Sequence, residues 1–315
     1  MFSVTTEGLT KKFNGFTAVN GLNLQINQGE VFGLLGPNGA GKTTTLRMLA
    51  CLLSPTAGSA AVAGYDIYKE PLKVRQSVGI LTENPSLYER LTALENMHFF
   101  AQAYGLSDAQ ERSRRIKELL EFFNLWDRRN DKVGAFSKGM KQKLAIVRAT
   151  VHKPPILFLD EPTAGLDPQS AKEIRDLMAA LSQQEKSTIL LCTHHLEDAE
   201  KLCQRVLIMN RGTCVILGSP DELRAKISGQ PTVQIDLVQV TPKIVTAVKA
   251  NPQAVEVFLN RQDASLRVKV DDARAATPAI VSDIVEAEGQ ILSVNVLRPS
   301  LEEAYLKLIN AEATA

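Results

Sequence analysis

Short apolar runs separated by longer mixed stretches run through much of the chain. Residues 2–35 are expected to form strands, with apolar and polar positions alternating over 17–27 and an unbroken apolar run at 31–35. Four further apolar runs, with helical stretches between them, predict short buried strands at residues 78–81, 156–159, 187–192 and 205–209. A helix is expected over 43–53, ended by residues 54–58. This alternation favours an α/β core with a mainly parallel sheet.

The segment from about residue 84 to 152 has an almost entirely helical pattern. Apolar residues at helical spacing predict one buried face, made of Ile116, Leu119, Leu120 and Phe123. The basic residues that flank this face are Arg112, Arg114, Arg115 and Lys117. A solvated basic surface is the favoured interpretation of these residues, ahead of a nucleic-acid site. We therefore expect a helical subdomain inserted into the α/β core.

A break at Gly229-Gln230-Pro231 marks a change of pattern. Beyond it, strands and helices are predicted in the order β-α-β-β-α-β, which matches the ferredoxin-like split unit. These elements are expected at residues 232–238, 242–250, 254–259, 266–270, 273–287 and 291–297, with a final helix at 300–310. No catalytic constellation is visible there, so structural, dimerising and regulatory roles all stay open. We expect one domain at residues 1–228 and a smaller α+β domain at 229–315.

Composition and charge restrict the function classes. The chain has 315 residues, 44% of them apolar, and a net charge of +1, which gives no support to a nucleic-acid binder driven by bulk positive charge. No apolar run approaches the roughly 20 residues that cross a bilayer, and the first residues do not resemble a signal peptide. The cysteines, which are Cys51, Cys192, Cys203 and Cys214, show no metal-ligand spacing. We expect reduced, buried thiols in a cytoplasmic protein.

A glycine-rich loop follows the strand predicted at 31–35 and opens the helix predicted at 43–53. It fits the phosphate-binding pattern G-x-x-x-x-G-K-[ST] with Gly36, Pro37, Asn38, Gly39, Ala40, Gly41, Lys42 and Thr43. Glycines let backbone amides wrap phosphates, and the helix N-terminus adds positive potential. Lys42 is expected between the β- and γ-phosphates, and Thr43 would offer its hydroxyl to Mg²⁺. The strand–loop–helix context favours nucleotide binding over a chance glycine loop.

Two adjacent carboxylates, Asp160 and Glu161, end the apolar strand predicted at 156–159. A buried strand of a parallel sheet delivers its C-terminal side chains to the ligand edge. Asp160 would hold Mg²⁺ there, and Glu161 would orient and deprotonate the attacking water. Adjacent carboxylates repel each other unless a cation lies near them, and Mg²⁺ supplies that cation. Together with the phosphate-binding loop, the pair indicates hydrolysis rather than an ordinary acidic strand end.

Between these motifs, residues 136–142 (FSKGMKQ) resemble the signature sequence of the ABC-transporter ATPases, usually LSGGQ. Ser137 and Gly139 match the family sequence, whereas Phe136, Lys138 and Met140 depart from it. The Ser-x-Gly opens a predicted helix, which places a hydroxyl and free amides where they suit a γ-phosphate. The resemblance covers residues 1 to about 228 and implies a P-loop NTPase core of the ABC type.

Further positions take their expected roles from this resemblance. Phe13 resembles the aromatic that stacks on adenine, Asp167 the loop that crosses the dimer interface, and His194 the switch histidine at the γ-phosphate. Glu83 stands where the family usually has a glutamine that touches Mg²⁺ or water. The resemblance therefore implies a nucleotide-binding set made of the loop together with Phe13, Thr44, Glu83, Ser137, Lys138, Gly139 and Asp167. It assigns catalysis to Glu161, His194 and Lys42. The implied metal ligands are Thr43, Asp160 and Glu83.

The histidine beside His194 does not match the family pattern. We interpret His195 as a surface residue. A metal site built from the His194–His195 pair is not expected, because adjacent residues point apart on a strand.

The tail at residues 295–305 resembles the C-terminal extension of daunorubicin-resistance-type exporter ATPases. The family works as a head-to-tail dimer, with each ATP and its Mg²⁺ between the loop of one copy and the Ser137–Gly139 helix of the other. The resemblance implies an ATPase that drives export through separate membrane-spanning permease subunits. It would lie peripherally on the cytoplasmic face of the plasma membrane, and no nucleic-acid partner is expected.

Two other function classes stay open at this point. One is an ABC ATPase acting on ribosomes or DNA without a membrane partner. Its ribosomal members usually carry two cassettes and its DNA-repair members a long inserted coiled coil, and the chain shows neither pattern. The other is a nucleotide-binding regulator without turnover. The presence of both Glu161 and His194 counts against that reading.

Overall fold

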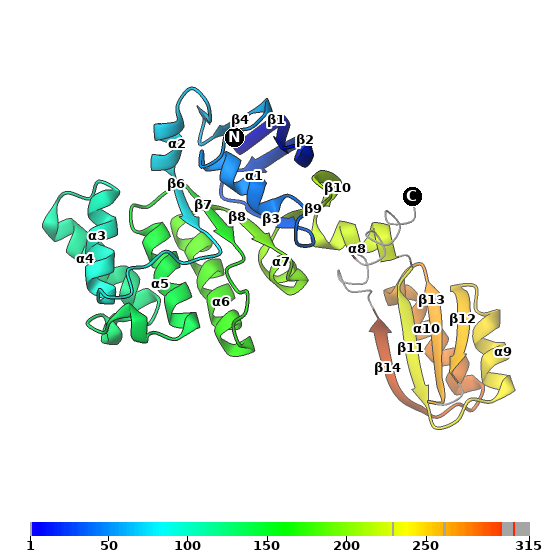
Figure 1. Cartoon of the computed structure of the whole chain (residues 1–315). Helices are drawn as coiled ribbons and strands as arrows, with labels where there is room; N and C mark the ends of the chain where they lie inside the picture. Colours follow the sequence, from blue (N-terminus) through cyan, green and yellow to red (C-terminus); the bar gives the residue numbers. More distant parts are fainter. Residues whose placement is uncertain (1, 229, 261–262, 298–304, 306–315) are drawn as a thin grey trace. The chain divides into compact units, whose positions relative to one another are not determined.

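The chain forms two compact units, residues 1–220 and 221–315, in the computed structural model (Figure 1). The structure describes residues 2–228, 230–260, 263–297 and 305. No helix among these described residues is long and apolar enough to cross a membrane. The α/β class predicted from the sequence is confirmed for the first unit, which carries all the expected site residues.

A six-stranded sheet forms the centre of the first unit, in the order β10-β9-β3-β8-β7-β6. Its strands are β3 (Val31–Leu35), β6 (Val78–Leu81), β7 (Ile156–Asp160), β8 (Thr188–Thr193), β9 (Arg205–Asn210) and β10 (Thr213–Gly218). All pairs are parallel except β9 with β10. Leu35 pairs with Thr193 and Asp160 with Cys192, so β3, β7 and β8 end at one edge. Because these strands are buried on both faces, their sequences read as unbroken apolar runs.

A second, antiparallel sheet packs beside it in the order β2-β1-β4-β5. Its strands are β1 (Phe2–Phe13), β2 (Phe16–Asn27), β4 (Ala57–Val62) and β5 (Tyr65–Asp66). Apolar side chains from this sheet and from α1 (Lys42–Leu49) share one core with β3 and β7. The phosphate-loop helix is therefore held between the two sheets.

The helix expected over 43–53 ends earlier than predicted. Cys51 has a left-handed φ of 55°, and the amides of Leu52 and Leu53 both donate to the carbonyl of Arg47, at 2.9 and 3.1 Å. This turn closes α1 at Leu49. The supposed helix-ending residues 57 and 58 instead begin β4, which the sequence analysis did not identify.

Before the helical segment, α2 (Pro71–Ser77) leads into β6. The segment itself contains α3 (Ala93–Ala103), α4 (Ala109–Phe122) and α5 (Lys138–Thr150), with short 3₁₀ turns at 126–128 and 133–135. The four apolar residues predicted to share one face of α4 are all buried. The prediction of a solvated basic face was wrong for Arg115, which is buried. Its guanidinium donates to the carbonyl of Thr150 at 3.0 Å and pairs with Glu185 at 2.7 Å. Arg115 therefore joins α4 to the end of α5.

The first unit is completed by α6 (Pro168–Glu185) and α7 (Leu196–Leu202). The second unit begins with α8 (Pro220–Ser228) and continues through β11 (Thr232–Leu237), α9 (Pro242–Ala250), β12 (Ala254–Asn260), β13 (Ser265–Val270), α10 (Ala273–Glu286) and β14 (Ile291–Leu297). Its antiparallel sheet has the order β12-β13-β11-β14, as expected for the ferredoxin-like arrangement. The final helix expected at 300–310 lies outside the described residues, apart from Tyr305.

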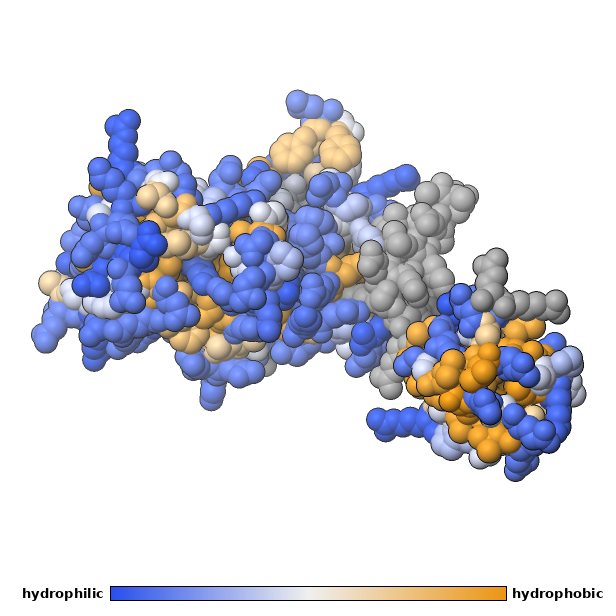
Figure 2. Space-filling model, turned by 90° about the horizontal axis from the view of Figure 1, so that it is seen from below, coloured by the Kyte–Doolittle hydropathy of each residue, from blue (hydrophilic) through white to orange (hydrophobic). Residues whose placement is uncertain are grey.

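Apolar side chains gather on the visible face of the second unit, whereas polar and charged side chains cover most of the visible face of the first (Figure 2). The exposed apolar residues of the second unit include Val238, Val255, Phe258, Leu259, Val285 and Leu292. They lie on both edge strands of the sheet, on α10 and just after β11, and exposed apolar patches are typical of protein contact sites.

Gly79 tests how closely β6 and α5 are packed. A Cβ atom at this position would lie 1.9 Å from the carbonyl oxygen of Ala149 and 2.7 Å from a methyl carbon of Leu157. We expect Gly79→Ala to lower the free energy of unfolding by about 1–3 kcal/mol or more through overpacking. Urea unfolding followed by circular dichroism measures this change. Gly8→Ala is the control, because its Cβ would meet no atom within 4 Å and it adds only left-handed strain. Equal midpoints for the two variants would contradict the packing described here.

Candidate functional site

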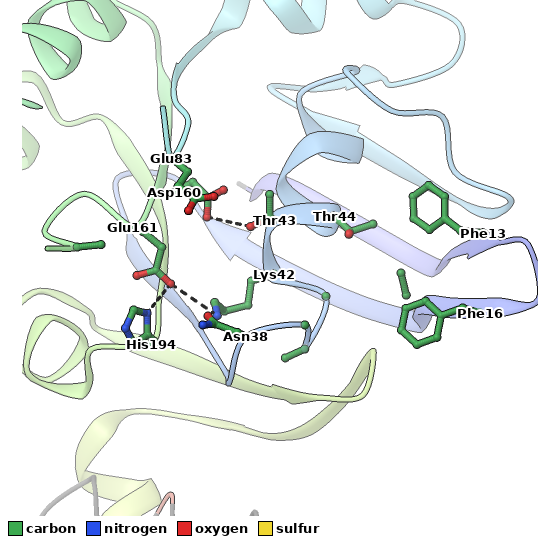
Figure 3. Close-up of a pocket in the computed structure, with 15 residues that line it drawn as sticks. Phe13, Phe16, Asn38, Lys42, Thr43, Thr44, Glu83, Asp160, Glu161 and His194 are labelled. Carbon is green, nitrogen blue, oxygen red and sulfur yellow. Dashed lines mark hydrogen bonds and ion pairs between the residues drawn. The ribbon is translucent and has the colours of Figure 1, made fainter. Parts of the chain in front are cut away.

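One cavity, of about 360 Å³, collects residues from both sheets and from the loop between β3 and α1 (Figure 3). It is lined by Phe13, Phe16, Ala18, Asn38, Gly39, Ala40, Gly41, Lys42, Thr43, Thr44, Glu83, Asp160, Glu161, Ala164 and His194. Most of the site residues expected from the sequence are therefore neighbours in space. They come together because β3, β7 and β8 end at the same edge of the parallel sheet.

The phosphate-binding loop has a backbone that only glycine accommodates at two positions. Gly41 has a φ of 108°, and a Cβ there would lie 2.5 Å from the carbonyl oxygen of Ala18. At Gly36, a Cβ would lie 2.4 Å from the carbonyl oxygen of Met209. At these two glycines, the loop backbone packs directly against the backbone carbonyls of neighbouring strands. The loop can therefore present its amides at the N-terminus of α1.

Lys42 is buried and folds back onto this loop. Its ammonium group donates to the carbonyls of Gly36, at 2.7 Å, and Pro37, at 3.3 Å. It also lies 3.7 Å from Oε1 of Glu161 (Figure 3). A buried ammonium group needs such partners, and a phosphate entering the loop would offer it stronger, charged ones.

Asp160 ends β7 and is only 2% exposed, and its Oδ1 accepts a hydrogen bond from the hydroxyl of Thr43 at 3.2 Å. Burial raises the pKa of this carboxyl above its ordinary value, and the Thr43 hydrogen bond opposes that rise. A desolvated carboxylate beside a hydroxyl is a donor set that suits a hard divalent cation. Glu83 lines the same cavity, so the residues present fit Mg²⁺.

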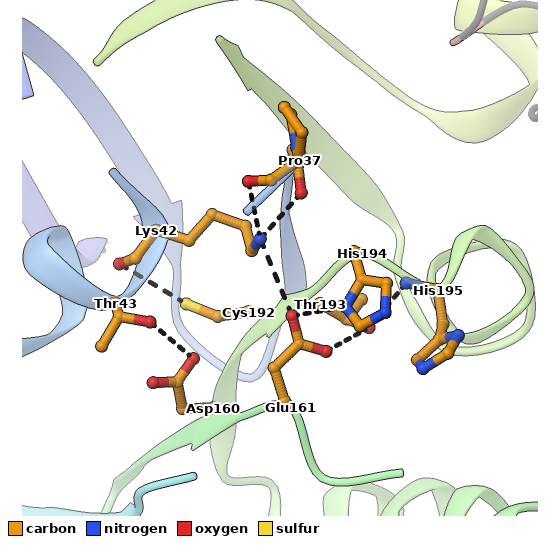
Figure 4. Close-up of polar contacts among 10 residues, drawn as sticks. Pro37, Lys42, Thr43, Asp160, Glu161, Cys192, Thr193, His194 and His195 are labelled. Carbon is orange, nitrogen blue, oxygen red and sulfur yellow. Dashed lines mark hydrogen bonds and ion pairs between the residues drawn. The ribbon is translucent and has the colours of Figure 1, made fainter. Parts of the chain in front are cut away.

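Glu161 leaves the strand through a left-handed turn, with a φ of 51°, and its amide donates to the carbonyl of Cys192 at 2.8 Å. The turn separates its carboxylate from that of Asp160 (Figure 4). Oε1 of Glu161 lies 2.9 Å from Nδ1 of His194, and Oε2 accepts from the hydroxyl of Thr193 at 3.4 Å. The carboxylate is thus held by Lys42 on one side and by the end of β8 on the other.

The two adjacent histidines do not point apart, so the prediction made from strand geometry was wrong. β8 ends at Thr193, so His194 and His195 do not follow strand geometry. Their ring centroids lie 4.1 Å apart, and possible ligand atoms of Glu161, His194 and His195 all lie within 4.8 Å of one another. The amide of His195 donates to the Thr193 hydroxyl at 2.9 Å, which fixes the turn that brings the rings together.

Phe16 lines the cavity beside Phe13 and was missed in the sequence. The two residues pair across the hairpin between β1 and β2, and both are exposed, at 61% and 43%. Their signal was present in the sequence, where Phe13-Asn14-Gly15-Phe16 is a hairpin turn with an aromatic residue on either side. Exposed aromatic faces at this end of the cavity can stack on a flat ring.

Among the residues described, Ser137, Lys138, Gly139 and Asp167 do not line this cavity. Ser137 caps α5, where its hydroxyl accepts from the amide of Met140 at 3.2 Å. Asp167 caps α6 by accepting from the amide of Ser170 at 2.9 Å. The two helix starts approach each other, since a Cβ on Gly139 would lie 3.0 Å from the Ser170 hydroxyl.

Known proteins are similar to this chain over almost its whole length. Residues 19–164 match the family model described as ABC transporter, and residues 218–309 match that of the DrrA1-3-like C-terminal domain. The linearmycin resistance ATP-binding protein LnrL of Bacillus subtilis is 32% identical over 302 residues, which cover 96% of each chain. This chain belongs to the ABC transporter ATP-binding proteins.

Other relatives of this ABC ATP-binding protein agree with that assignment. The daunorubicin/doxorubicin resistance ATP-binding protein DrrA of Streptomyces peucetius is 34% identical, over 97% of this chain and 92% of its own. The structure of cbiO1 from Clostridium perfringens, described as part of an ABC transporter complex, is similar with a TM-score of 0.66 and 29% identity, over 71% of this chain and 91% of that one. A dimeric ATP-binding cassette in a post-hydrolysis state, bound to ADP and Pi, is similar with a TM-score of 0.63 and 28% identity. This match covers 69% of this chain and 98% of that one.

The ABC ATP-binding protein described here is thus the ATP-hydrolysing, nucleotide-binding subunit of an ABC transporter. The prediction of this family and of ATPase activity is confirmed. These relatives are named for antibiotic resistance, and their names mention neither ribosomes nor DNA.

The exposed phenylalanines offer a direct test of where the base of ATP lies. We expect Phe13→Ala to weaken ATP binding about tenfold, because base–aromatic stacking contributes on the order of 1–3 kcal/mol. Phe16→Ala should weaken it as well if both faces are used. Phe2→Ala is the matched control, since Phe2 is exposed to a similar extent at the far end of the same strand. Isothermal titration calorimetry gives the three dissociation constants, and equal values for Phe2→Ala and Phe13→Ala would exclude stacking on Phe13.

Proposed function

We propose that this chain energises an exporter of the antibiotic-resistance type, as a head-to-tail homodimer bound to separate membrane-spanning permease subunits. The observation that carries this proposal is the full-length similarity to proteins named for linearmycin and daunorubicin resistance, which includes the C-terminal domain. The proposed location is peripheral, on the cytoplasmic face of the plasma membrane.

The loop and Lys42 bind the phosphates in this proposal. The Lys42 ammonium group leaves the carbonyls of Gly36 and Pro37 and contacts the β- and γ-phosphates instead. Charged phosphate oxygens accept stronger hydrogen bonds from an ammonium group than neutral carbonyls do. Thr43, Asp160 and Glu83 would hold Mg²⁺, which neutralises phosphate charge when bound. Glu83 takes the place of the usual glutamine, and its carboxylate adds a further oxygen donor to this set.

Glu161 acts as the general base, and His194 orients it. The attacking water gives its proton to the Glu161 carboxylate as its oxygen bonds to the γ-phosphorus, and ADP leaves with the electron pair of the broken bond. The 2.9 Å contact between Nδ1 of His194 and Oε1 of Glu161 holds this carboxylate in place. Before ATP binds, the same carboxylate faces Lys42 at 3.7 Å. ATP entry would therefore separate these two groups and free Glu161 for the water.

A second copy completes each site. Ser137, Lys138 and Gly139 stand at the N-terminus of α5 but outside the cavity of their own chain. A helix N-terminus favours an anion, so it can close the open side of an ATP held by another copy. Asp167 would lie at the same interface. Dimeric cassettes among the solved relatives support this arrangement.

The permease would contact the helical segment and the region around Glu83. Tyr88 and Phe99 are half exposed there and meet edge to face at 5.0 Å, with Phe100 beside them. An exposed aromatic cluster fits an apolar partner helix. Movement of this segment would then reach the permease.

Residues 229–315 are proposed to form an accessory domain in addition to the ATP-binding domain at 1–228. Its exposed apolar side chains would hold two copies together between turnovers.

We expect truncation after Gly229 to shift the nucleotide-free protein towards the monomer, measured by sedimentation velocity. An unchanged oligomeric state and ATPase activity would show that this domain has another role.

Glu161→Gln tests the assignment of the base. The amide keeps the shape of the side chain but cannot take a proton, so ATP should still bind while turnover falls by at least 100-fold. A stable dimer should then accumulate with MgATP and not with MgADP, as measured by size-exclusion chromatography with light scattering. Turnover at the parental rate would remove Glu161 as the base.

A further inference from the structure

A buried carboxylate on α7 holds together three segments around the ATP site. Asp198, in the first turn of α7, is fully buried. Its Oδ1 accepts from Nη1 of Arg175 at 2.9 Å, and its Oδ2 accepts from the hydroxyl of Thr163. Thr163 and Arg175 are themselves buried, with 4% and 8% of their surface exposed. We call these three residues the Asp198 clasp.

Each member of the clasp belongs to a segment that carries one expected site residue. Thr163 follows Glu161 by two positions in the loop 161–167. Arg175 lies in α6, the helix that Asp167 caps. Asp198 follows His194 by four positions, and its amide donates to the carbonyl of His195 at 3.2 Å. The segments that carry the base, the dimer-interface residue and the switch histidine therefore meet at the carboxylate of Asp198.

The loop between Glu161 and Asp167 is short and hydrogen-bonded within itself. The amide of Ala164 donates to the carbonyl of Glu161 at 3.2 Å, and that of Leu166 to the carbonyl of Thr163 at 3.3 Å. These bonds give a movement at Asp167 a path to Thr163. Through the clasp, the same path continues to α7 and the turn that carries His194.

Stability alone gives a poor reason for this arrangement. Taking a carboxylate and a guanidinium out of water is costly, and well-packed apolar residues of similar size often stabilise a protein as much or more. Among the described residues, Nε of Arg175 finds no hydrogen-bond partner, although it is buried. An unpaired buried donor costs part of the free energy of folding that the hydrogen bonds of the network contribute. Apolar packing would not provide directional contacts to two separate segments.

We propose that the Asp198 clasp couples the loop at the dimer interface to the position of His194, and so sets the geometry of Glu161 for hydrolysis. This inference rests on the roles proposed above for Glu161, His194 and Asp167. Thr163, Arg175 and Asp198 are positioning residues that do not touch ATP. Contact of a second copy with Asp167 is transmitted through Thr163 to Asp198, and from there to the turn bearing His194.

Thr163 allows a test that changes one hydroxyl. Thr163→Val removes the donor to Asp198 and keeps the volume, whereas Thr163→Ser restores the donor. We expect Thr163→Val to lower kcat about tenfold with KM for ATP changed less than about twofold, because the hydrogen bond goes to a charged acceptor. Thr163→Ser should keep kcat within about threefold of the parent.

Thr150→Val is the matched control. Thr150 is also a buried threonine, but its hydroxyl donates only to backbone carbonyls of its own helix, those of Ile146 and Val147. We expect this variant to keep kcat, even where its melting temperature falls as far as that of Thr163→Val. Steady-state ATPase assays at 25 °C and thermal unfolding of the full chain give these numbers.

The outcomes separate a positioning role from a structural one. A normal kcat in Thr163→Val, or an equal loss of kcat in Thr163→Ser and Thr150→Val, would overturn the inference. If Thr163→Val does not fold, Asp198→Asn replaces it, and a folded Asp198→Asn with normal kcat would equally overturn the clasp. An inactive parent, or a Glu161→Gln variant with parental turnover, would instead remove the proposed function on which the inference rests.

Discussion

The rest of the structure depends on how two neighbouring carboxylates are held at one edge of a parallel sheet. Asp160 is buried and its pKa is raised by that burial, while Glu161 turns away through a left-handed φ. The ammonium of Lys42 lies 3.7 Å from the carboxylate of Glu161, and the imidazole of His194 contacts the same carboxylate at 2.9 Å. Two neighbouring carboxylates beside one ammonium group leave negative charge that a divalent cation would offset. Under the proposed function, ATP would therefore enter together with Mg²⁺.

The surrounding elements follow from this arrangement. Glycines at two tight positions bring α1 close to β2 and β9, so that the loop amides and Lys42 reach the sheet edge. The hairpin of β1 and β2 adds two exposed aromatic faces at the other end of the cavity. In the proposed dimer, the start of α5 in the partner copy closes the open side of this cavity. The proposed Asp198 clasp links that contact to the base.

Continuous apolar strands and the G-x-x-x-x-G-K-T loop made the core and most of the site predictable, because local pattern and tertiary position agree there. The failures have local causes. The early end of α1 depends on a left-handed Cys51, which propensity does not show. Arg115 is buried against the carbonyl of Thr150. This acceptor lies 35 positions away in the sequence, so the local pattern does not show it. His195 meets His194 because the strand ends one residue before the pair. The clasp unites residues that no motif connects.

The most direct test of the shared site uses a mixed dimer and an ATP analogue with a photoreactive group on its γ-phosphate. One copy carries Lys42→Ala, which removes its own phosphate contact, and is labelled with heavy isotopes; the other copy is unlabelled and binds the analogue. After illumination, mass spectrometry of the peptides shows which copy carries the cross-link. The account predicts labelling of residues 137–141 in the heavy Lys42→Ala copy. Cross-links confined to the unlabelled copy would contradict an ATP site closed by the signature helix of a second chain.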